Sequence, residues 1–411
     1  MLNPQTNQRE LAYVVQIDEI KPIEGYDRVE HARVGGWWVI VKKDQFQVGD
    51  LAIYIEVDSK VPETEIFEFL AKRNYKVKTL KMCKVISQGL LMHPEDFGWK
   101  EDTSGQFAGD APLIKISQTE YCLEGDFLTE KLGITYADTE DNKRKANSVD
   151  KYKVMAQRRP KLFKQPWAKW MMRRNWGKKI MFFFFGKKKD IKRSWPSWVV
   201  KTDEERCQNM PWLFPGNPDE EWIATEKIDG TSTTFTMKGH GKKREFYVCS
   251  RNVVFDKPDK KCFYETNVYV EMAEKYKIEE RLSNFIGNNK DIEFVTLQGE
   301  TYGEGIQKRD YHMKEHCFMA FNFIVKKVNE PPVRLDPITM TEVVFHGMGI
   351  PCVPIVDEQF KIPATCDELL VMAEGESVID GGMREGLVFR SKDGVKSFKA
   401  VSNPFLLKYH S

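Results

Sequence analysis

The stretch that decides how this chain folds is residues 224–232, Ala224-Thr225-Glu226-Lys227-Ile228-Asp229-Gly230-Thr231-Ser232. It follows the apolar residues Trp222 and Ile223, so a β-strand is expected to end near the lysine. An amine presented there can attack the α-phosphorus of a nucleotide and hold the nucleotidyl group as a phosphoramidate. Asp229 could gather a metal ion, and Gly230 lets the backbone approach a ligand closely. An exposed lysine before an Asp-Gly hairpin turn has the same sequence, so the rest of the chain must decide between the two interpretations.

Length and composition favour an intracellular protein of several domains. At 411 residues with 41% apolar content, the chain can form two or three cores. No run approaches the ~18 apolar residues of a membrane span, and the first residues, Met1 to Thr6, lack the plan of a secretory signal. Eight scattered cysteines without a C-x-x-C pair predict reduced thiols, not disulfides or a zinc site. We expect a cytoplasmic or nuclear protein with no membrane partner.

One segment carries most of the positive charge. Residues 151–193 contain 16 Lys and Arg but only one acid, Asp190, although the whole chain has a net charge of only +2. Aromatic residues are interleaved with these cations: Tyr152, Phe163, Trp167, Trp170, Trp176 and Phe182 to Phe185. Cations offer phosphate contacts and aromatic rings offer faces for unpaired bases, so the segment favours contact with nucleic acid. The alternatives are a basic amphipathic helix on an acidic surface of this chain and a localisation signal.

The first 135 residues predict a small β-barrel. Short runs rich in Val, Ile, Tyr and Trp recur between turns that contain glycine, at residues 11–17, 37–41, 51–56, 77–82 and 85–92. About five short strands favour an oligonucleotide-binding (OB-like) barrel, and an SH3-like barrel remains open. Residues 136–194 predict a helical or poorly packed connector.

From residue 195 to residue 411 the pattern predicts an α+β domain built on antiparallel sheets. Thr202 is a candidate N-cap for a helix. Helical stretches are expected at 269–285 and 366–373. Strand-like runs occupy residues 222–226, 231–238, 245–250, 292–298, 317–325, 386–391 and 395–401.

Polar and aromatic groups follow Lys227 in a fixed order. They are Arg251 at the end of a strand, Glu300 among glycines, Phe321 in an aromatic run, Glu385 before a glycine, and Lys399 on the return strand of a hairpin. This ordered set resembles the motifs of the covalent lysyl-nucleotidyltransferases, the superfamily of DNA ligases, RNA ligases and mRNA capping enzymes. Ser232, where DNA ligases and capping enzymes usually have arginine, and Glu226 before the nucleophile are similar to RNA ligases. A barrel ahead of the transferase domain resembles the Naegleria-type (fifth-family) ATP-dependent RNA ligases, whose catalytic domain is ATP-grasp-like.

The resemblance implies a role for each of these residues. Lys227 would be adenylylated by ATP, and Lys399 would bind the α-phosphate. Asp229 and Glu385 would hold a hydrated Mg²⁺ or Mn²⁺, mostly through water. The remaining residues would contact the nucleotide: Glu226 at the adenine amino group, Phe321 on the base, Glu300 at the ribose, and Gly230, Ser232 and Arg251 along the phosphate side.

Two departures from the family pattern leave details open. Relatives often carry a second lysine two residues after Lys399, where this chain has Val401; Lys396 or Lys408 could substitute. A two-residue turn at Asp393-Gly394 would pair Lys399 with Val388 and direct Glu385 to the opposite face. If both side chains serve one pocket, we expect a bulge, a longer loop, or Glu385 outside the ladder.

The implied function is that of an ATP-dependent RNA ligase, which joins RNA 3′-OH and 5′-phosphate ends through lysyl-AMP and AMP-capped RNA, in RNA repair or processing. The alternatives are a DNA or nick ligase and a catalytically inactive RNA-binding relative. His312 and His316, four residues apart, superficially suggest a metal pair. Lys314 lies between them and no H-E-x-x-H motif is present, so structural roles are expected.

Overall fold

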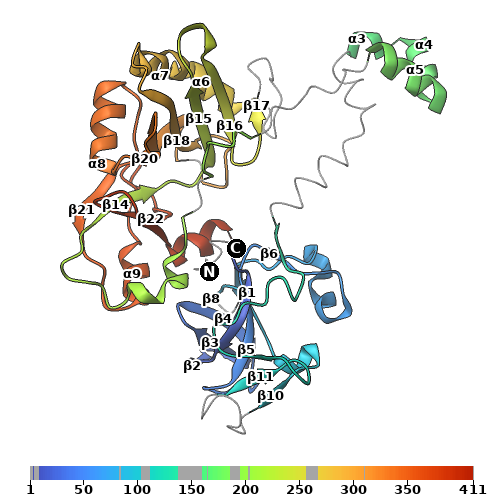
Figure 1. The fold of residues 1–411 in the computed structure, drawn as a ribbon. Coiled ribbons are helices and arrows are strands. Elements are labelled where there is room, and N and C mark those ends of the chain that lie inside the picture. The colour runs from blue at the N-terminus through green and yellow to red at the C-terminus, as the bar shows by residue number, and fades with distance from the viewer. Residues whose placement is uncertain are drawn as a thin grey trace.

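The computed structural model describes residues 3, 9–82, 85–102, 112–137, 160–163, 165–185, 195–201, 204–255, 267–309 and 311–410. These residues form an N-terminal β-barrel, a small group of helices, and a larger domain of two sheets with helices (Figure 1). The limits at residues 135 and 194 stay predictions. Strand β13 (Thr135–Tyr136) pairs with β6 (Ser59–Lys60), so the barrel continues to the last residues described before the connector.

The barrel is built around β5 (Leu51–Ile55), in which every residue is buried. Leu51, Ile53 and Ile55 belong to one apolar cluster, whereas Ala52 and Tyr54 belong to another. A strand with both faces buried reads as a continuous apolar run, which explains the sequence LAIYI. β5 pairs with β1 (Ala12–Gln16) and β9 (Leu90–Met92), and beside them runs a meander of β2 (Glu19–Ile23), β3 (Tyr26–Val34) and β4 (Trp37–Lys42).

Short elements complete the barrel. They are η1 (Glu65–Arg73), β7 (Leu80–Met82), β8 (Val85–Ser87), η2 (Pro94–Phe97), β10 (Lys100–Asp102), β11 (Leu113–Lys115) and β12 (Tyr121–Cys122). The expected strand 85–92 is therefore two strands. Gly89 separates them because its backbone has φ +107° and a β-carbon there would lie 2.3 Å from the ring of Tyr54.

The described part of the connector is helical: α3 (Pro160–Phe163), α4 (Pro166–Met172) and α5 (Asn175–Phe185). The remainder, including Tyr152 and Asp190, lies outside the described residues. No helix in the described ranges is both long and apolar enough to cross a membrane.

Two antiparallel sheets form the larger domain. One has the order β17-β16-β15-β18-β19-β20 and the other β21-β14-β22-β23. The strands are β14 (Trp222–Lys227), β15 (Thr231–Lys238), β16 (Glu245–Ser250), β17 (Val254–Phe255), β18 (Ile292–Tyr302), β19 (Cys317–Lys327), β20 (Val333–Arg334), β21 (Ile355–Phe360), β22 (Gly386–Ser391) and β23 (Ser397–Val401). The α+β architecture expected from the sequence is confirmed.

Helices cover the outer faces of these sheets (Figure 1). The core of the six-stranded sheet includes residues from α6 (Val268–Lys275), α7 (Ile278–Ile286), α8 (Pro337–Met340) and η6 (Thr341–Gly347). The core of the four-stranded sheet includes α9 (Cys366–Met372) and η3 (Cys207–Asn209). Short turns η4 (Pro211–Leu213) and η5 (Gly241–Lys243) and the C-terminal α10 (Asn403–Phe405) and η7 (Leu406–His410) complete the domain.

Two helix predictions were wrong. The single helix expected at 269–285 is broken between α6 and α7, where Lys277 adopts φ +47°. The helix expected to start at Thr202 is absent from the described residues that follow it. Thr202 itself is outside the described ranges, and Lys399 N donates to Glu205 O, so this segment contacts β23 through one parallel bridge between Arg206 and Lys399. Backbone partners on an open sheet edge outweigh a local helix signal here.

Candidate active site

A cavity of about 820 Å³ opens between the two sheets and is lined by all ten predicted site residues. They are Glu226, Lys227, Asp229, Gly230, Ser232, Arg251, Glu300, Phe321, Glu385 and Lys399. These residues come from five strands and their connections, and the chain between Lys227 and Lys399 spans most of the domain. The sequence alone shows only the order of these residues along the chain, and the structure brings their side chains together in one cavity.

The Asp-Gly element is not a hairpin turn. β14 belongs to the four-stranded sheet and β15 to the six-stranded sheet, so Asp229 and Gly230 lie where the chain crosses from one sheet to the other. The amide of Asp229 donates to the Tyr311 hydroxyl at 2.6 Å. A β-carbon at Gly230 would lie 2.4 Å from Thr301 O and 2.9 Å from Glu300 Cγ. The glycine is required because β18 passes against it, bringing Glu300 beside the lysine.

Lys227 forms an ion pair across the cavity floor. In the β14–β22 ladder Lys227 lies opposite Gly386, and its Nζ donates to Glu385 Oε1 at 2.6 Å. Desolvation lowers the pKa of Lys227, but the carboxylates of Glu385, Glu300 and Asp229 together outweigh it and raise that pKa above its ordinary value. In the enzyme without ligands, the amine is therefore held in its protonated, non-nucleophilic form.

The pKa of Glu300 is also raised, because this carboxyl is desolvated and shares the cavity with other carboxylates. Desolvation, opposed by Lys227 and reinforced by Glu385 and Asp229, raises the pKa of Glu300 to about 8. At neutral pH this carboxyl is mostly protonated and can donate a hydrogen bond as well as accept one.

The hairpin register is as predicted. Lys399 pairs with Val388, and β22 begins at Gly386, so Glu385 lies just outside the ladder and both charged side chains line the same cavity. A β-carbon at Gly386 would lie 2.2 Å from Ala400 O, which is why a glycine follows the glutamate. The prediction that Glu385 would leave the regular ladder is confirmed.

Neither Lys396 nor Lys408 takes the role expected of a second lysine at position 401. Val401 is buried against Ile86 of the barrel and Leu406, so a charged side chain cannot occupy this position. Lys396 is exposed and pairs with Glu220, and Lys408 lies over Tyr409. Neither lysine is among the residues that line the cavity. The suggested substitution is therefore not supported.

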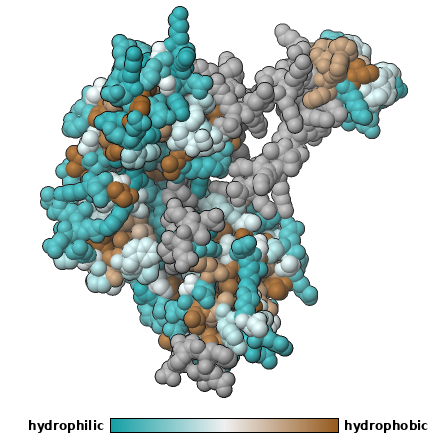
Figure 2. Space-filling view, viewed as in Figure 1, coloured by the Kyte–Doolittle hydropathy of each residue, from teal (hydrophilic) through white to brown (hydrophobic). Residues whose placement is uncertain are grey.

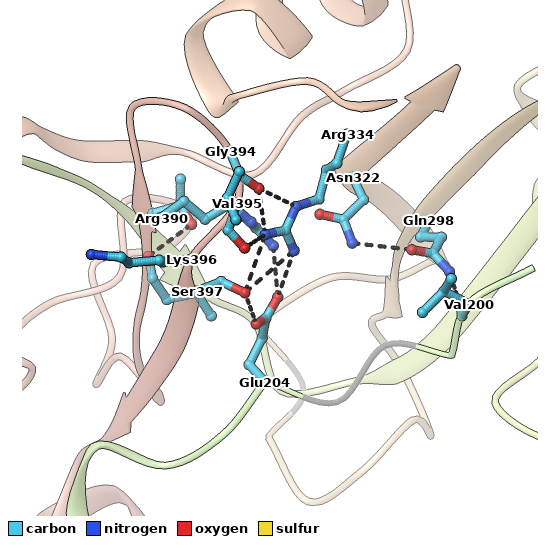
Figure 3. A network of polar contacts seen from close by, with 12 residues as sticks. Val200, Glu204, Gln298, Asn322, Arg334, Arg390, Gly394, Val395, Lys396 and Ser397 are labelled. Carbon is cyan, nitrogen blue, oxygen red and sulfur yellow. Dashed lines mark hydrogen bonds and ion pairs between the residues drawn. The ribbon is translucent and has the colours of Figure 1, made fainter. Parts of the chain in front are cut away.

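An ionic network that includes the buried Arg390 fixes the strand that carries Lys399 (Figure 3). Glu204 accepts from Arg390 at 3.3 Å and lies 3.5 Å from Arg334, and the Ser397 hydroxyl donates to it. Arg390 is 2% exposed. These contacts tie the segment ahead of β14 to β20, β22 and β23, which fixes the strand that carries Lys399.

A bulge in β19 directs one aromatic ring into the cavity. Asn322 pairs with Gln298 and Ala320 pairs with Gly299, so Phe321 has no partner in the ladder. The extra residue turns Phe321 toward the cavity, whereas Phe323 is fully buried in the core. Strict alternation would have placed both rings on one face, and sequence periodicity does not reveal the bulge.

Glu226, at the deeper end of the cavity, is held by a segment that the sequence did not indicate. Ser377 Oγ donates to Glu226 Oε1 at 2.5 Å, and Val378 N donates to Oε2 at 2.8 Å. The carboxylate is 2% exposed, and desolvation raises its pKa despite these bonds. Each oxygen keeps a lone pair that can accept from a ligand.

The N-terminal barrel supplies one wall of the cavity. Asp58, Lys76, Val77, Lys78 and Ala137 are among the lining residues. Arg251 approaches the same wall, with Nη2 3.4 Å from the Tyr136 hydroxyl. No sequence motif marks these barrel residues, because their role depends on how two separate domains meet.

The acidic residues of the cavity fit a hydrated divalent cation. Glu385 Oε2 is buried and makes no hydrogen bond with the described residues. No group of three His, Cys, Asp or Glu in the described ranges is placed to hold a metal directly. Two carboxylates acting through water suit Mg²⁺ or Mn²⁺ better than a dedicated cage. His316 instead contacts Glu271 at 2.9 Å, and neither His312 nor His316 lines the cavity.

Comparison with known proteins gives a consistent result. Residues 220–409 match a family model described as RNA ligase, and residues 11–94 match one described as an OB-fold domain. A Naegleria gruberi RNA ligase variant solved with ATP and Mn is 25% identical, with a TM-score of 0.65 and coverage of 98% of this chain and 99% of that chain. The same ligase with PPi has a TM-score of 0.64, 25% identity and the same coverage. The search of curated proteins gave no match.

The variants among those structures repeat the spacing of the site. Their substitutions fall at a lysine and an aspartate two residues apart, at two glutamates 85 residues apart, and at a lysine 14 residues after the second glutamate. Here Asp229 follows Lys227 by two residues, Glu385 follows Glu300 by 85, and Lys399 follows Glu385 by 14.

Proposed function

We infer that this chain, whose catalytic domain belongs to the RNA ligase family, is an ATP-dependent RNA ligase that joins 3′-OH and 5′-phosphate RNA ends through a lysyl-AMP intermediate. The observation that carries this inference is the contact between Lys227 and Glu385 in a cavity that also contains Lys399. A nucleophilic amine, a carboxylate able to hold a metal, and a second cation within one cavity are the groups that nucleotidyl transfer needs.

The first reaction modifies Lys227. The neutral amine attacks the α-phosphorus of ATP, a nitrogen–phosphorus bond forms, the bond to the bridging oxygen of the β-phosphate breaks, and pyrophosphate leaves. The amine must lose a proton before or during attack. Because Glu385 helps raise the pKa of Lys227, drawing that carboxylate away from the amine lowers the pKa of the nucleophile.

The other cavity residues position the nucleotide. We assign Lys399 to the α-phosphate, where its charge stabilises the transition state. Phe321 would stack on the base, Glu226 would accept from the adenine amino group, and Glu300 would bind the ribose. Ser232 and Arg251 would line the phosphate side, where Gly230 keeps the backbone close to the ligand.

The metal ligands in this assignment are Asp229 and Glu385. A divalent cation held there through water would offset the negative charge of the triphosphate. The metal would therefore be needed for labelling of Lys227, and chelation should abolish it.

Two further reactions complete the joining. The RNA 5′-phosphate displaces Lys227 from the α-phosphorus and receives AMP, and the RNA 3′-OH then attacks that 5′-phosphate and releases AMP. RNA is thus the proposed partner. An intracellular location is also proposed, and it is supported by the six described cysteines, which are all free thiols.

The decisive experiment is labelling with ATP that carries the isotope at the α-phosphate, in Mg²⁺ or Mn²⁺. Wild type should retain label in a denaturing gel, and Lys227→Ala should show none. Lys242→Ala, at an exposed turn, is the matched control and should label normally. A folded wild type without pre-bound AMP that takes no label would contradict the proposal.

Sealing assays then separate the substrates. RNA ends should outcompete DNA ends, and ATP should label the lysine where GTP does not. Preferential sealing of DNA would replace the proposal with a DNA ligase.

A further inference from the structure

The helices of the connector form a unit with its own small core. Phe163, Ala168 and Met181 are buried, and the residues packed on them all come from the same segment: Leu162, Met171, Met172, Phe182 and Phe185. Residues 160–185 are well below the length of about 40 at which a single core usually sustains a fold. A unit of this size gains stability when a partner covers part of its surface.

The surface that this unit exposes is aromatic. Trp176, Ile180 and Phe183 follow one another at helical spacing on α5, on a different face from the buried Gly177 and Met181. Trp170 of α4 extends this row, because its ring lies 5.9 Å from that of Trp176 at 82°. The row, with Trp167 and Phe184, is here called the outer face. Three of its tryptophans are about half exposed, and Phe183 is 82% exposed. Figure 2 shows hydrophobic residues on the surface of this helical group.

Cations lie among these rings. Residues 160–185 contain seven Lys and Arg and no Asp or Glu. Lys169, Arg173, Arg174 and Lys179 are exposed, and the guanidinium of Arg174 lies 3.9 Å from the ring centre of Trp170. The outer face therefore alternates flat rings with positive charges and carries no acid that would neutralise them. Its charge complements a polyanion, and its rings suit a polyanion that also exposes π-faces.

We propose that the outer face binds single-stranded RNA next to the end being joined. Bases stack on Trp170, Trp176 and Phe183, and Lys169, Arg173 and Lys179 contact phosphates. This inference rests on the proposed function, which makes RNA the substrate, and it adds a second site outside the cavity. A membrane surface is the competing partner. Single-stranded RNA is favoured because it presents phosphates and exposed bases in alternation, and the outer face presents cations and aromatic rings together.

The chain keeps this unit within reach of the active site. Ten residue steps separate Phe185 from Trp195, which limits their separation to about 36 Å. Trp195 is joined to the catalytic domain, because its indole donates to Val199 O and Gln298 of β18 donates to Val200 O. RNA held on the outer face is therefore close enough to present an end to the cavity.

The test compares binding of a fluorescein-labelled, unpaired RNA of about 20 nucleotides to full-length variants by anisotropy. Trp170→Ala/Trp176→Ala should weaken binding at least about tenfold, because each stacked base contributes substantially. Lys169→Ala/Arg173→Ala/Lys179→Ala should lower the slope of log K against log salt by about 2. The matched controls are Trp212→Ala, an exposed tryptophan outside the connector, and Lys242→Ala/Lys243→Ala.

Labelling of Lys227 by ATP alone separates the two hypotheses, since the outer face is not needed for it. Normal labelling with weakened RNA binding in the outer-face variants supports the proposal. Normal labelling with unchanged RNA affinity and salt slope overturns it and leaves the proposed function intact. Failure of wild-type labelling refutes the proposed function, whatever the RNA affinity. Loss of sedimentation with phosphatidylglycerol vesicles, without loss of RNA binding, would assign the outer face to membranes and overturn the proposal.

Discussion

At the scale of single residues, the main finding is that Lys227, the proposed nucleophile, is held in its protonated form. Glu385 forms an ion pair with Lys227, and three carboxylates raise the pKa of the amine. Asp229 and Glu385, the proposed metal ligands, are two of these carboxylates, so the groups proposed to hold the metal also suppress the reactivity of the amine until ligands bind. This arrangement protects a partly exposed amine from side reactions and makes its activation depend on ligand binding.

Replacing Glu385 should raise the reactivity of Lys227 toward an added reagent while abolishing its adenylylation by ATP. In the enzyme without ligands, Glu385→Gln should make Lys227 several-fold more reactive toward an amine-acylating reagent at pH 8, because the carboxylate that contributes most to raising its pKa is removed. Adenylylation should fall to background because a metal ligand is gone. Mass spectrometry of the peptide containing Lys227 measures the first effect. Glu293→Gln, which removes the partner of Lys238 and Lys326 outside the cavity, should change neither. Equal acylation of wild type and Glu385→Gln would contradict the assignment.

Glu300 should make stability depend on pH. Its pKa is about 8 in the folded protein and near 4.5 when unfolded. Between these values the folded state keeps a proton that the unfolded state has lost, so the free energy of unfolding falls as pH rises through this window. Glu300→Gln should remove part of that fall, on the order of 1 kcal/mol after screening by solvent. Urea unfolding at pH 5 and pH 8.5 measures it, and parallel changes in wild type and variant would exclude the raised pKa.

At the scale of elements, the site depends on how strands are fixed as well as on where they run. β22 and β23 form a regular hairpin, but their position relative to the rest of the domain is set by Glu204, which pairs with Arg390 and Arg334. Glu204 lies ahead of β14, the first strand of the larger domain. The hairpin that carries Lys399 is thus anchored by residues nearly two hundred positions earlier in the chain.

Glu204→Gln should destabilise the catalytic domain by about 3 kcal/mol, because it leaves the buried guanidinium of Arg390 without its charged partner. Adenylylation should also decrease, since Lys399 follows the strand. Urea unfolding measures the stability change. Glu221→Gln is the control; it pairs with Lys392 and Lys361 on the surface, and little change is expected there. Similar stability of the two variants would show that the network does not anchor the hairpin.

At the scale of the whole molecule, the cavity is completed only when the barrel meets the catalytic domain. Trp37 of β4 donates to Asn209 at 2.8 Å, and Val401 packs against Ile86, so the two domains share polar and apolar contacts. This interface places Lys76 and Lys78 at the cavity wall. The barrel is therefore part of the proposed active site.

Lys76→Ala/Lys78→Ala should raise KM for ATP in lysine labelling about tenfold, because charge-assisted contacts to phosphate are lost. Stability should change little. Initial labelling rates across ATP concentrations measure the effect. Lys72→Ala/Lys81→Ala, two exposed lysines of the same region that do not line the cavity, should behave as wild type. An unchanged KM in the first variant would remove the barrel from nucleotide binding.

The sequence by itself determined the strands around Lys227 and the register of the β22–β23 hairpin. Several strand limits agree to the residue, such as β15 at 231–238 and β22 at 386–391. These features depend on local periodicity and turn residues, which neighbouring positions encode. Ten of the cavity-lining residues were also identified, through resemblance to a family and not through geometry.

Only the tertiary structure decided the details that control chemistry. The bulge at Phe321, the support of Glu226 by Ser377, the burial of Val401 and the barrel lysines at the cavity wall all arise between segments far apart in the chain. The raised pKa of Lys227 also belongs here, because it is the sum of charges from three separate elements. The local sequence pattern determines which secondary structure a segment can form, whereas the pKa and the direction of a side chain depend on the groups that pack against it.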